Sequence, residues 1–313
     1  EIKPFLLSAL SGILLTLTFP EYNLEVFAWI AWIPLFLAIE NATPQRAALL
    51  GFVTGMVFYN LGLSWINNTL INYGNLHWIL SFAVLGLLSG YLSFFIALFC
   101  YFLRRVCVEN RIQFFLLAPV LWTSFEYLRS THSKYGFSWL GLGYSQFQNL
   151  PVIQLAEWTG VYGISWLILL VNSGLYLSWR CWREQKQNPF ELKEGRRILS
   201  VTLFVFSLWL VYGTQFLKET LSSTTNRPHI KVGLVQGNVE QFMKWNPVYQ
   251  NIVINKYRDL TLKAAEKKPD LILWPETAIP FYFEENQSET DLMRDLVREI
   301  KIPILFGSLH REK

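Results

Sequence analysis

Apolar residues fill most of the first 217 positions, and short polar segments divide them into seven runs. A helix needs roughly 20 predominantly apolar residues to cross the hydrocarbon core of a bilayer, and most of the runs approach or exceed this length. The first two runs are shorter and have Pro20 and Pro34 at or inside their ends, which favours tilted helices or a helical hairpin. The expected spans are Pro4–Phe19, Val26–Ile39, Ala47–Ile71, Leu76–Leu103, Ile112–Leu128, Val161–Trp179 and Ile198–Leu217. The pattern predicts a polytopic α-helical membrane domain over residues 1–221, with about seven helices.

The periodicity changes after a polar linker at residues 222–228. Short β-rich runs then alternate with amphipathic helical patterns, in the order Ile230–Val235, Pro247–Lys267, Leu271–Trp274, Glu289–Ile300 and Ile304–Phe306. Strands that alternate with helices indicate a parallel sheet with right-handed crossovers. Three such strands leave a sheet edge and much apolar surface uncovered. We therefore expect residues 229–313 to be the first, incomplete part of a larger α/β domain.

The composition narrows the class of protein. Charged residues make up 16% of the chain, against roughly 25% in an ordinary soluble domain, and 52% of the residues are hydrophobic. This balance excludes a disordered chain, a disulfide scaffold and a typical cytosolic enzyme. The net charge of +4 is small, and the basic residues form no surface stripe, so no nucleic-acid partner is expected.

Basic residues in the loops predict the orientation. If the N-terminus is cytoplasmic, three basic residues lie outside: Arg129, Lys134 and Lys218. Eleven lie inside: Lys3, Arg46, Arg104, Arg105, Arg111, Arg180, Arg183, Lys186, Lys193, Arg196 and Arg197. Seven crossings from the inside then place residues 218–313 on the periplasmic side of a bacterial inner membrane.

Metal and disulfide chemistry is not expected from the sequence. Cys100, Cys107 and Cys181 fall within spans or at their cytoplasmic ends, where disulfides are not expected and the spacing builds no metal cluster. The histidines are scattered without a ligand-like spacing. The sequence thus predicts no metal and no cofactor.

Two features of the membrane part carry candidate chemistry. Glu126 and Arg129 lie three positions apart on one helix face, and residues 137–146 form an aromatic, glycine-rich loop on the outer side. Both features fit an interfacial ion pair beside an aromatic belt. They also fit a site for a lipid headgroup and acyl chain at the outer membrane surface. Asparagines in or near the spans, Asn172 among them, are expected to hydrogen-bond between helices.

Two segments follow the first two predicted strands, where α/β sheets place their working residues. They are Val235-Gln236-Gly237-Asn238-Val239, with Lys244-Trp245-Asn246-Pro247 beyond it, and Leu273-Trp274-Pro275-Glu276-Thr277-Ala278-Ile279-Pro280. Glu276 lies between two prolines among apolar neighbours, a setting that favours a raised pKa and a role as general base. The alternative is a carboxylate that caps the following turn.

The Trp274-Pro275-Glu276 motif resembles the nitrilase (carbon–nitrogen hydrolase) superfamily. A set of motifs on the multi-span scaffold narrows the resemblance, and it covers essentially the whole chain. These motifs are Gly141-Leu142-Gly143-Tyr144-Ser145-Gln146, Gly160-Val161-Tyr162-Gly163-Ile164-Ser165, Val235-Gln236-Gly237-Asn238, Lys244-Trp245 and Trp274-Pro275-Glu276-Thr277. Together they closely resemble the apolipoprotein N-acyltransferase family.

The resemblance implies a fold and an activity. The fold is a multi-span helical domain followed by a nitrilase-like αββα sandwich. The activity is acyl transfer from a phospholipid donor to the N-terminal amine of a diacylglyceryl lipoprotein, through a thioester on a Glu–Lys–Cys triad. Glu276 matches the family's general base, and Trp245 matches a tryptophan at the substrate entrance. The family's Lys and Cys would lie beyond Lys313, so we expect the chain as it stands to be inactive, and monomeric.

Other classes stay open from the residues. A membrane-tethered nitrilase-type amidase would use the same Glu276 but would pass the acyl group to water, and it would need no lipid platform. A triad-less protein could bind lipid or lipoprotein without turnover. A transporter is a weaker alternative, because Glu126 and Arg129 alone do not form an intramembrane path.

Overall fold

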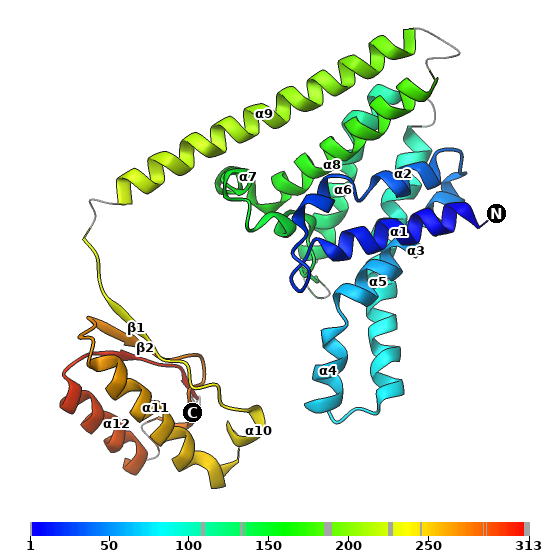
Figure 1. The fold of residues 1–313 in the computed structure, drawn as a ribbon. Helices are drawn as coiled ribbons and strands as arrows, with labels where there is room; N and C mark the ends of the chain where they lie inside the picture. The colour runs from blue at the N-terminus through cyan, green and yellow to red at the C-terminus, as the bar shows by residue number, and fades with distance from the viewer. Residues whose placement is uncertain are drawn as a thin grey trace. The chain divides into compact units, whose positions relative to one another are not determined.

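The computed structural model describes residues 2–107, 110–131, 134, 136–184, 190–224, 228–244, 246–283, 285 and 287–309. The chain folds as two compact units, Glu1–Ser223 and Thr224–Lys313. The first unit is helical, and the second combines short strands with helices (Figure 1).

The helices of the first unit coincide with the apolar runs of the sequence. They are α1 Lys3–Leu17, η1 Glu25–Trp29, α2 Ile33–Ile39, α3 Pro44–Gly62, α4 Trp65–Asn72, α5 Trp78–Val106, α6 Arg111–Thr131, η2 Leu142–Gln146, α7 Leu150–Ile153, α8 Ala156–Glu184 and α9 Phe190–Thr224. Three helical segments, in α5, α8 and α9, are long and apolar enough to cross a bilayer, and the bent pair α3 and α4 could form a fourth span. Several apolar helices confirm a membrane domain. The count of seven crossings stays a prediction, because α1 and the segment Glu25–Ile39 are shorter.

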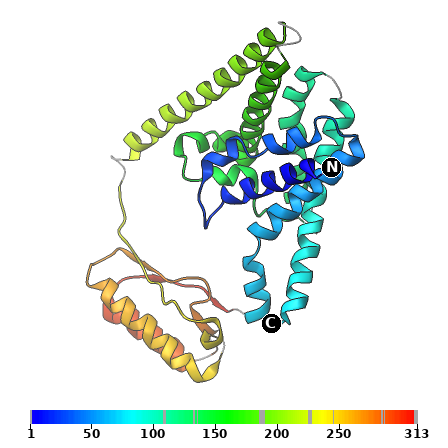
Figure 2. The same cartoon turned by 45° about the vertical axis from the view of Figure 1, so that its right-hand side comes forward.

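The run Ala47–Ile71, expected as one span, is broken. The chain bends by 54° between α3 and α4. At the break, a side chain on Gly62 would meet Leu140 Cδ1 at 2.6 Å, so the outer loop packs directly onto the bend. Figures 1 and 2 both show α4 alongside the first part of α5. The run is therefore not one continuous helix, although the bent pair could still form one span, and the bend itself could not be read from hydrophobicity.

The run Val26–Ile39 is also broken, between η1 and α2. At this break, the side chain of Asn172 in α8 hydrogen-bonds two backbone groups of the segment. Its Oδ1 accepts the backbone N–H of Trp32 at 3.0 Å, and its Nδ2 donates to the carbonyl of Ala28 at 2.8 Å. Irregular backbone at membrane depth requires such partners within the protein, so the prediction that Asn172 hydrogen-bonds between helices is confirmed.

The second unit contains a parallel sheet of three strands in the order β1–β2–β4. The strands are β1 Val232–Leu234, β2 Leu271–Leu273 and β4 Ile304–Leu305. The connections contain α10 Gln241–Lys244, η3 Pro247–Tyr249, α11 Gln250–Ala265 and α12 Gln287–Ile300. Helices α11 and α12 lie on one face of the sheet (Figures 1 and 2). The alternation in the sequence therefore predicted this small parallel sheet, whereas the larger nitrilase-like sandwich stays a prediction.

A second sheet was not predicted. It pairs β3 Ile279–Tyr282 with β5 Ser308–Leu309 in parallel. Pro280 lies inside β3, and a proline argues against a strand when only the sequence is read. Each of these strands starts just after one strand of the first sheet has ended. The turns between the two sheets therefore lie at the carboxyl edge of the first sheet.

Candidate functional site

The segments after β1 and β2 come together at the carboxyl edge of the sheet. They enclose a cavity of 220 Å³. Gln236, Gly237 and Asn238 line it from the first segment, and Pro275 and Glu276 from the second. The two segments that the sequence singled out are thus brought to one place.

Glu276 lies in the turn between β2 and β3. Thr277, beside it, has a left-handed backbone with φ of 50°. The carbonyl of Glu276 accepts a hydrogen bond from Nζ of Lys244 at 3.4 Å. The side chain of Glu276 is exposed, so the apolar surroundings expected from its sequence neighbours do not enclose it within the described part of the unit. Its carboxylate is open to a reactant at the cavity.

Gly307 holds this turn from the third strand. A Cβ at Gly307 would lie 2.7 Å from the backbone nitrogen of Thr277 and 3.1 Å from Cα of Glu276. Real side chains do not approach backbone so closely, so only glycine lets the end of β4 reach the turn. The position of Glu276 therefore depends on all three strands.

Tyr257 of α11 forms part of the cavity wall. Its ring stacks on Trp274 with 4.9 Å between centroids. Burial raises the pKa of the Tyr257 hydroxyl, and a hydrogen bond with the backbone of Gly237 partly opposes that rise. The phenol is therefore neutral at physiological pH and contacts the segment after β1. Sequence reasoning placed Tyr257 only on the apolar face of a helix, and nothing in the pattern marked it as a cavity residue.

Lys244 ends α10 and lines the same cavity. Trp245, predicted to contact substrate, follows it but lies outside the described residues.

In the membrane unit, Glu126 and Arg129 anchor the outer loop. They are 1% and 0% exposed. Glu126 Oε1 accepts the backbone N–H of Leu142 at 2.6 Å, and Arg129 Nη1 donates to the carbonyls of Phe137 and Trp139 at 2.9 and 2.8 Å. The side chain of Glu126 also hydrogen-bonds Ser165 of α8, so the two residues tie the loop to the helices beside it. They fix the loop instead of facing the lipid surface.

The loop that they hold forms one wall of a 660 Å³ cavity. Trp139, Leu140 and Tyr144 contribute from the loop, and the ends of α1 and α3 and the start of α4 complete the lining. Trp65 and Trp139 pack with their ring centroids 5.0 Å apart. The volume lies within the roughly 300–1,000 Å³ of small-molecule sites. Its mostly aromatic and aliphatic walls could receive an acyl chain.

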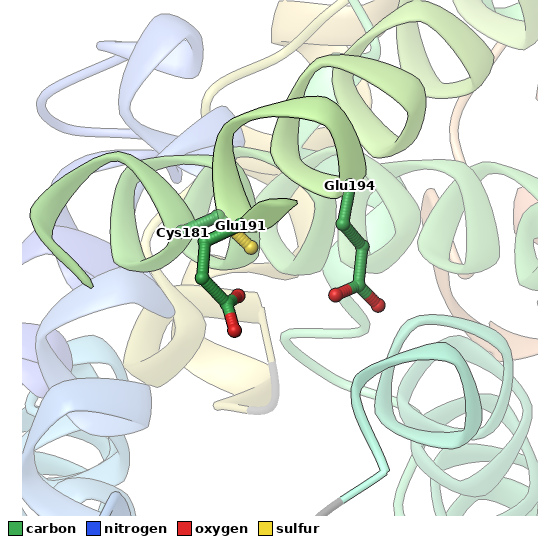
Figure 3. A group of neighbouring side chains, drawn as sticks. All are labelled: Cys181, Glu191 and Glu194. Atoms are coloured by element: carbon green, nitrogen blue, oxygen red, sulfur yellow. The ribbon is translucent and has the colours of Figure 1, made fainter. Parts of the chain in front are cut away.

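A group of metal-ligand type lies at the other end of the unit. Figure 3 shows Cys181 of α8 beside Glu191 and Glu194 of α9, with ligand atoms within 4.8 Å of one another. The sequence spacing did not indicate this group. Arg111 occupies it, because its guanidinium pairs with Glu191, with Glu194 at 2.9 Å and with Glu184 at 2.6 Å. The arrangement therefore joins α6, α8 and α9 by ion pairs.

Comparison with known proteins assigns the family. The profile described as "Apolipoprotein N-acyltransferase N-terminal domain" matches residues 11–174. An apolipoprotein N-acyltransferase of Geobacter metallireducens is 38% identical over 312 residues, which is 99% of this chain and 58% of the relative. That of Chlorobaculum tepidum is 31% identical over 97% of this chain and 55% of the relative, and that of Methylococcus capsulatus is 32% identical over 91% and 53%. This chain spans little more than half the length of these relatives, and it belongs to the apolipoprotein N-acyltransferase family.

Proposed function

We propose that the protein transfers an acyl chain from a membrane phospholipid to the N-terminal amine of the diacylglyceryl-cysteine of a bacterial lipoprotein. The meeting of the two strand-end segments around a cavity with Glu276 in its wall carries the proposal. The choice of acyl transfer as the reaction rests on the family, because the relatives are named apolipoprotein N-acyltransferases.

Glu276 acts as the general base in this proposal. The cysteine of the triad attacks the ester carbon of the phospholipid while Glu276 accepts the thiol proton. The ester C–O bond breaks, the proton passes to the leaving alkoxide, and a lysophospholipid departs. The lipoprotein amine then attacks the thioester, an amide forms, and the amine proton returns through Glu276 to the thiolate. The lysine stabilises the oxyanion of each tetrahedral intermediate.

The relatives are longer than the matched region, and the proposal assigns the triad lysine and cysteine to that further part of the protein. It also includes a completed αββα sandwich that begins near residue 229. The excess of basic loop residues on one side supports a bacterial inner membrane location with residues 218–313 in the periplasm. The 660 Å³ cavity supports a role of the membrane unit in holding the acyl chain of a substrate. A bound acyl chain reacts faster because it is held in a fixed position.

The test uses the complete reading frame, purified and placed in vesicles with a phospholipid donor and a diacylglyceryl-cysteine peptide. Mass spectrometry follows the addition of one acyl group to the peptide and of one to the protein. We expect Glu276→Gln to lower the rate by roughly 10²–10⁴-fold, the usual contribution of a general base. Glu266→Gln is the matched control, because Glu266 is an exposed glutamate at the end of α11, outside the cavity lining.

Each outcome distinguishes one class of function. Transfer that survives in Glu276→Gln removes Glu276 from the mechanism. Hydrolysis of a small amide without a peptide product supports the amidase. Binding of lipid or peptide with no turnover supports the triad-less binding protein.

A further inference from the structure

A second large cavity of the membrane unit lies where three distant parts of the chain meet. Its volume is 500 Å³, and its walls are the first turns of α1, the turn between α2 and α3, and the last turns of α8. None of its described lining residues lines the 660 Å³ cavity. It is therefore a site separate from that cavity.

The cavity is positively charged. Lys3 of α1, Arg46 of α3 and Arg183 of α8 all line it. Glu40 is the carboxylate among the described lining residues, and it accepts Nη2 of Arg183 at 2.6 Å and Nε of Arg180 at 3.1 Å. Among the described lining residues, three positive charges and one negative charge give a net charge of +2. Glu184 pairs with Arg183 at 3.8 Å and with Arg180 at 2.9 Å and compensates part of this charge, and the remaining positive charge favours an anion.

The helix ends at the cavity are of both kinds. Lys3 and Pro4 begin α1, and Asn41 and Ala42 lie just before α3, while the last turns of α2 and α8 also line the cavity. A helix N-terminus carries a partial positive charge and a C-terminus a partial negative charge, so these contributions oppose one another. The preference for an anion therefore comes from the basic side chains.

The rest of the lining is apolar. Leu7 and Leu37 form part of the wall, and the guanidinium of Arg183 lies over the ring of Trp179, 4.9 Å from its centroid. Tryptophan and basic residues gather at the membrane–water interface. A charged rim beside an aliphatic wall fits the phosphate and the glycerol end of a lipid better than it fits a soluble anion.

We propose that this cavity binds one phospholipid with an anionic headgroup. Basic pockets between transmembrane helices recognise such headgroups through their charge. The phosphate contacts Lys3, Arg46 and Arg183, and the start of the acyl chains lies against Leu7 and Leu37. This site does not depend on the proposed acyl transfer.

The test is a binding titration of the complete reading frame in neutral detergent, read by native mass spectrometry. Phosphatidylglycerol, phosphatidylcholine and inorganic phosphate are added in separate arms. We expect phosphatidylglycerol to bind, and the double variant Lys3→Gln/Arg46→Gln to weaken it about 30-fold, roughly fivefold for each cation. Lys3→Arg/Arg46→Lys keeps both charges and should retain binding. Arg105→Gln removes an exposed cation outside the cavity lining and should change little.

Three results would overturn the proposal. One is equal binding of phosphatidylglycerol and phosphatidylcholine, which would remove the role of charge. Another is an equal loss in Arg105→Gln and in the double variant, which would mean general surface attraction. The third is inorganic phosphate that binds as tightly as phosphatidylglycerol and displaces it, which would make the site one for a free anion.

Discussion

The backbone N–H of Leu142 donates a hydrogen bond to Oε1 of Glu126 across 2.6 Å. This contact joins the C-terminal end of α6 to a loop in which Trp139, Leu140 and Tyr144 line the 660 Å³ cavity. A carboxyl group buried to this degree needs hydrogen-bond partners, and here it receives a backbone donor. The shape of the cavity is thereby coupled to a residue that does not line it.

The first prediction concerns Glu126. Glu126→Ala leaves the Leu142 N–H without its acceptor, and we expect the free energy of unfolding to fall by about 1–3 kcal/mol, the cost of a buried donor left without a partner. Thermal or denaturant unfolding in detergent measures the change. Glu126→Gln retains an acceptor oxygen and should recover part of the loss. Equal stability of Glu126→Ala and the wild type would contradict the anchoring role.

Gly307 gives a prediction about the catalytic edge. Gly307→Ala places a methyl group 2.7 Å from the Thr277 nitrogen, so the turn that carries Glu276 has to move. A displacement of about 1 Å can lower activity roughly 100-fold, and we expect a loss of that order in the acyl-transfer assay.

Gly233→Ala is the control for that experiment. A Cβ at Gly233 would lie 3.3 Å from Cγ of Pro269, a contact that a small shift relieves. We expect this variant to keep its activity and to change stability by less than about 1 kcal/mol. Full activity in Gly307→Ala would show that the turn tolerates displacement.

A substitution of Arg111 tests whether the cluster of Cys181, Glu191 and Glu194 is held by ion pairs or by a metal ion. Arg111→Gln leaves Glu184, Glu191 and Glu194 close together without the shared guanidinium. Because these side chains are partly exposed, we expect a loss of about 1–3 kcal/mol, between the values for exposed and buried pairs. Arg197→Gln removes an exposed cation of α9 and should cost less than about 1 kcal/mol. A chelator should leave the melting temperature of the wild type unchanged. A fall with the chelator would show that a metal ion holds this cluster instead.

The contact of Trp245 with substrate stays a prediction. In the complete reading frame, we expect Trp245→Ala to lower kcat/KM about tenfold or more, because a large aromatic side chain supplies much of a contact surface. The midpoint of thermal unfolding should change little. Trp245→Phe should retain part of the activity. A variant that unfolds at lower temperature but turns over normally would assign Trp245 to packing.

The periodicity of apolar residues predicted those helices and strands whose formation depends on neighbouring residues in the sequence. The run around α5 continued as one long helix, and the alternation after residue 229 gave the three parallel strands. The rule that working residues follow the carboxyl ends of strands singled out the segments that contain Gly237 and Glu276, and these segments line one cavity. These features follow from side-chain periodicity and sheet geometry, both of which a single sequence records.

Features that depend on distant partners could not be predicted. Leu140 packs at Gly62 and accompanies the bend between α3 and α4, yet the two residues lie far apart in the sequence. Cys181, Glu191 and Glu194 meet only because α8 and α9 pack side by side. The place of Tyr257 in the cavity wall could not be predicted either, because it depends on how α11 packs against the sheet.

The break between η1 and α2 also bears on how the protein assembles in its membrane. The Ala28 carbonyl and the Trp32 N–H depend on a side chain that is synthesised about 140 residues later, in α8. Until α8 arrives, these two groups need water or lipid headgroups, because hydrocarbon offers them no partner. We therefore expect the early segment to complete its packing only after α8, with Asn172, has been synthesised.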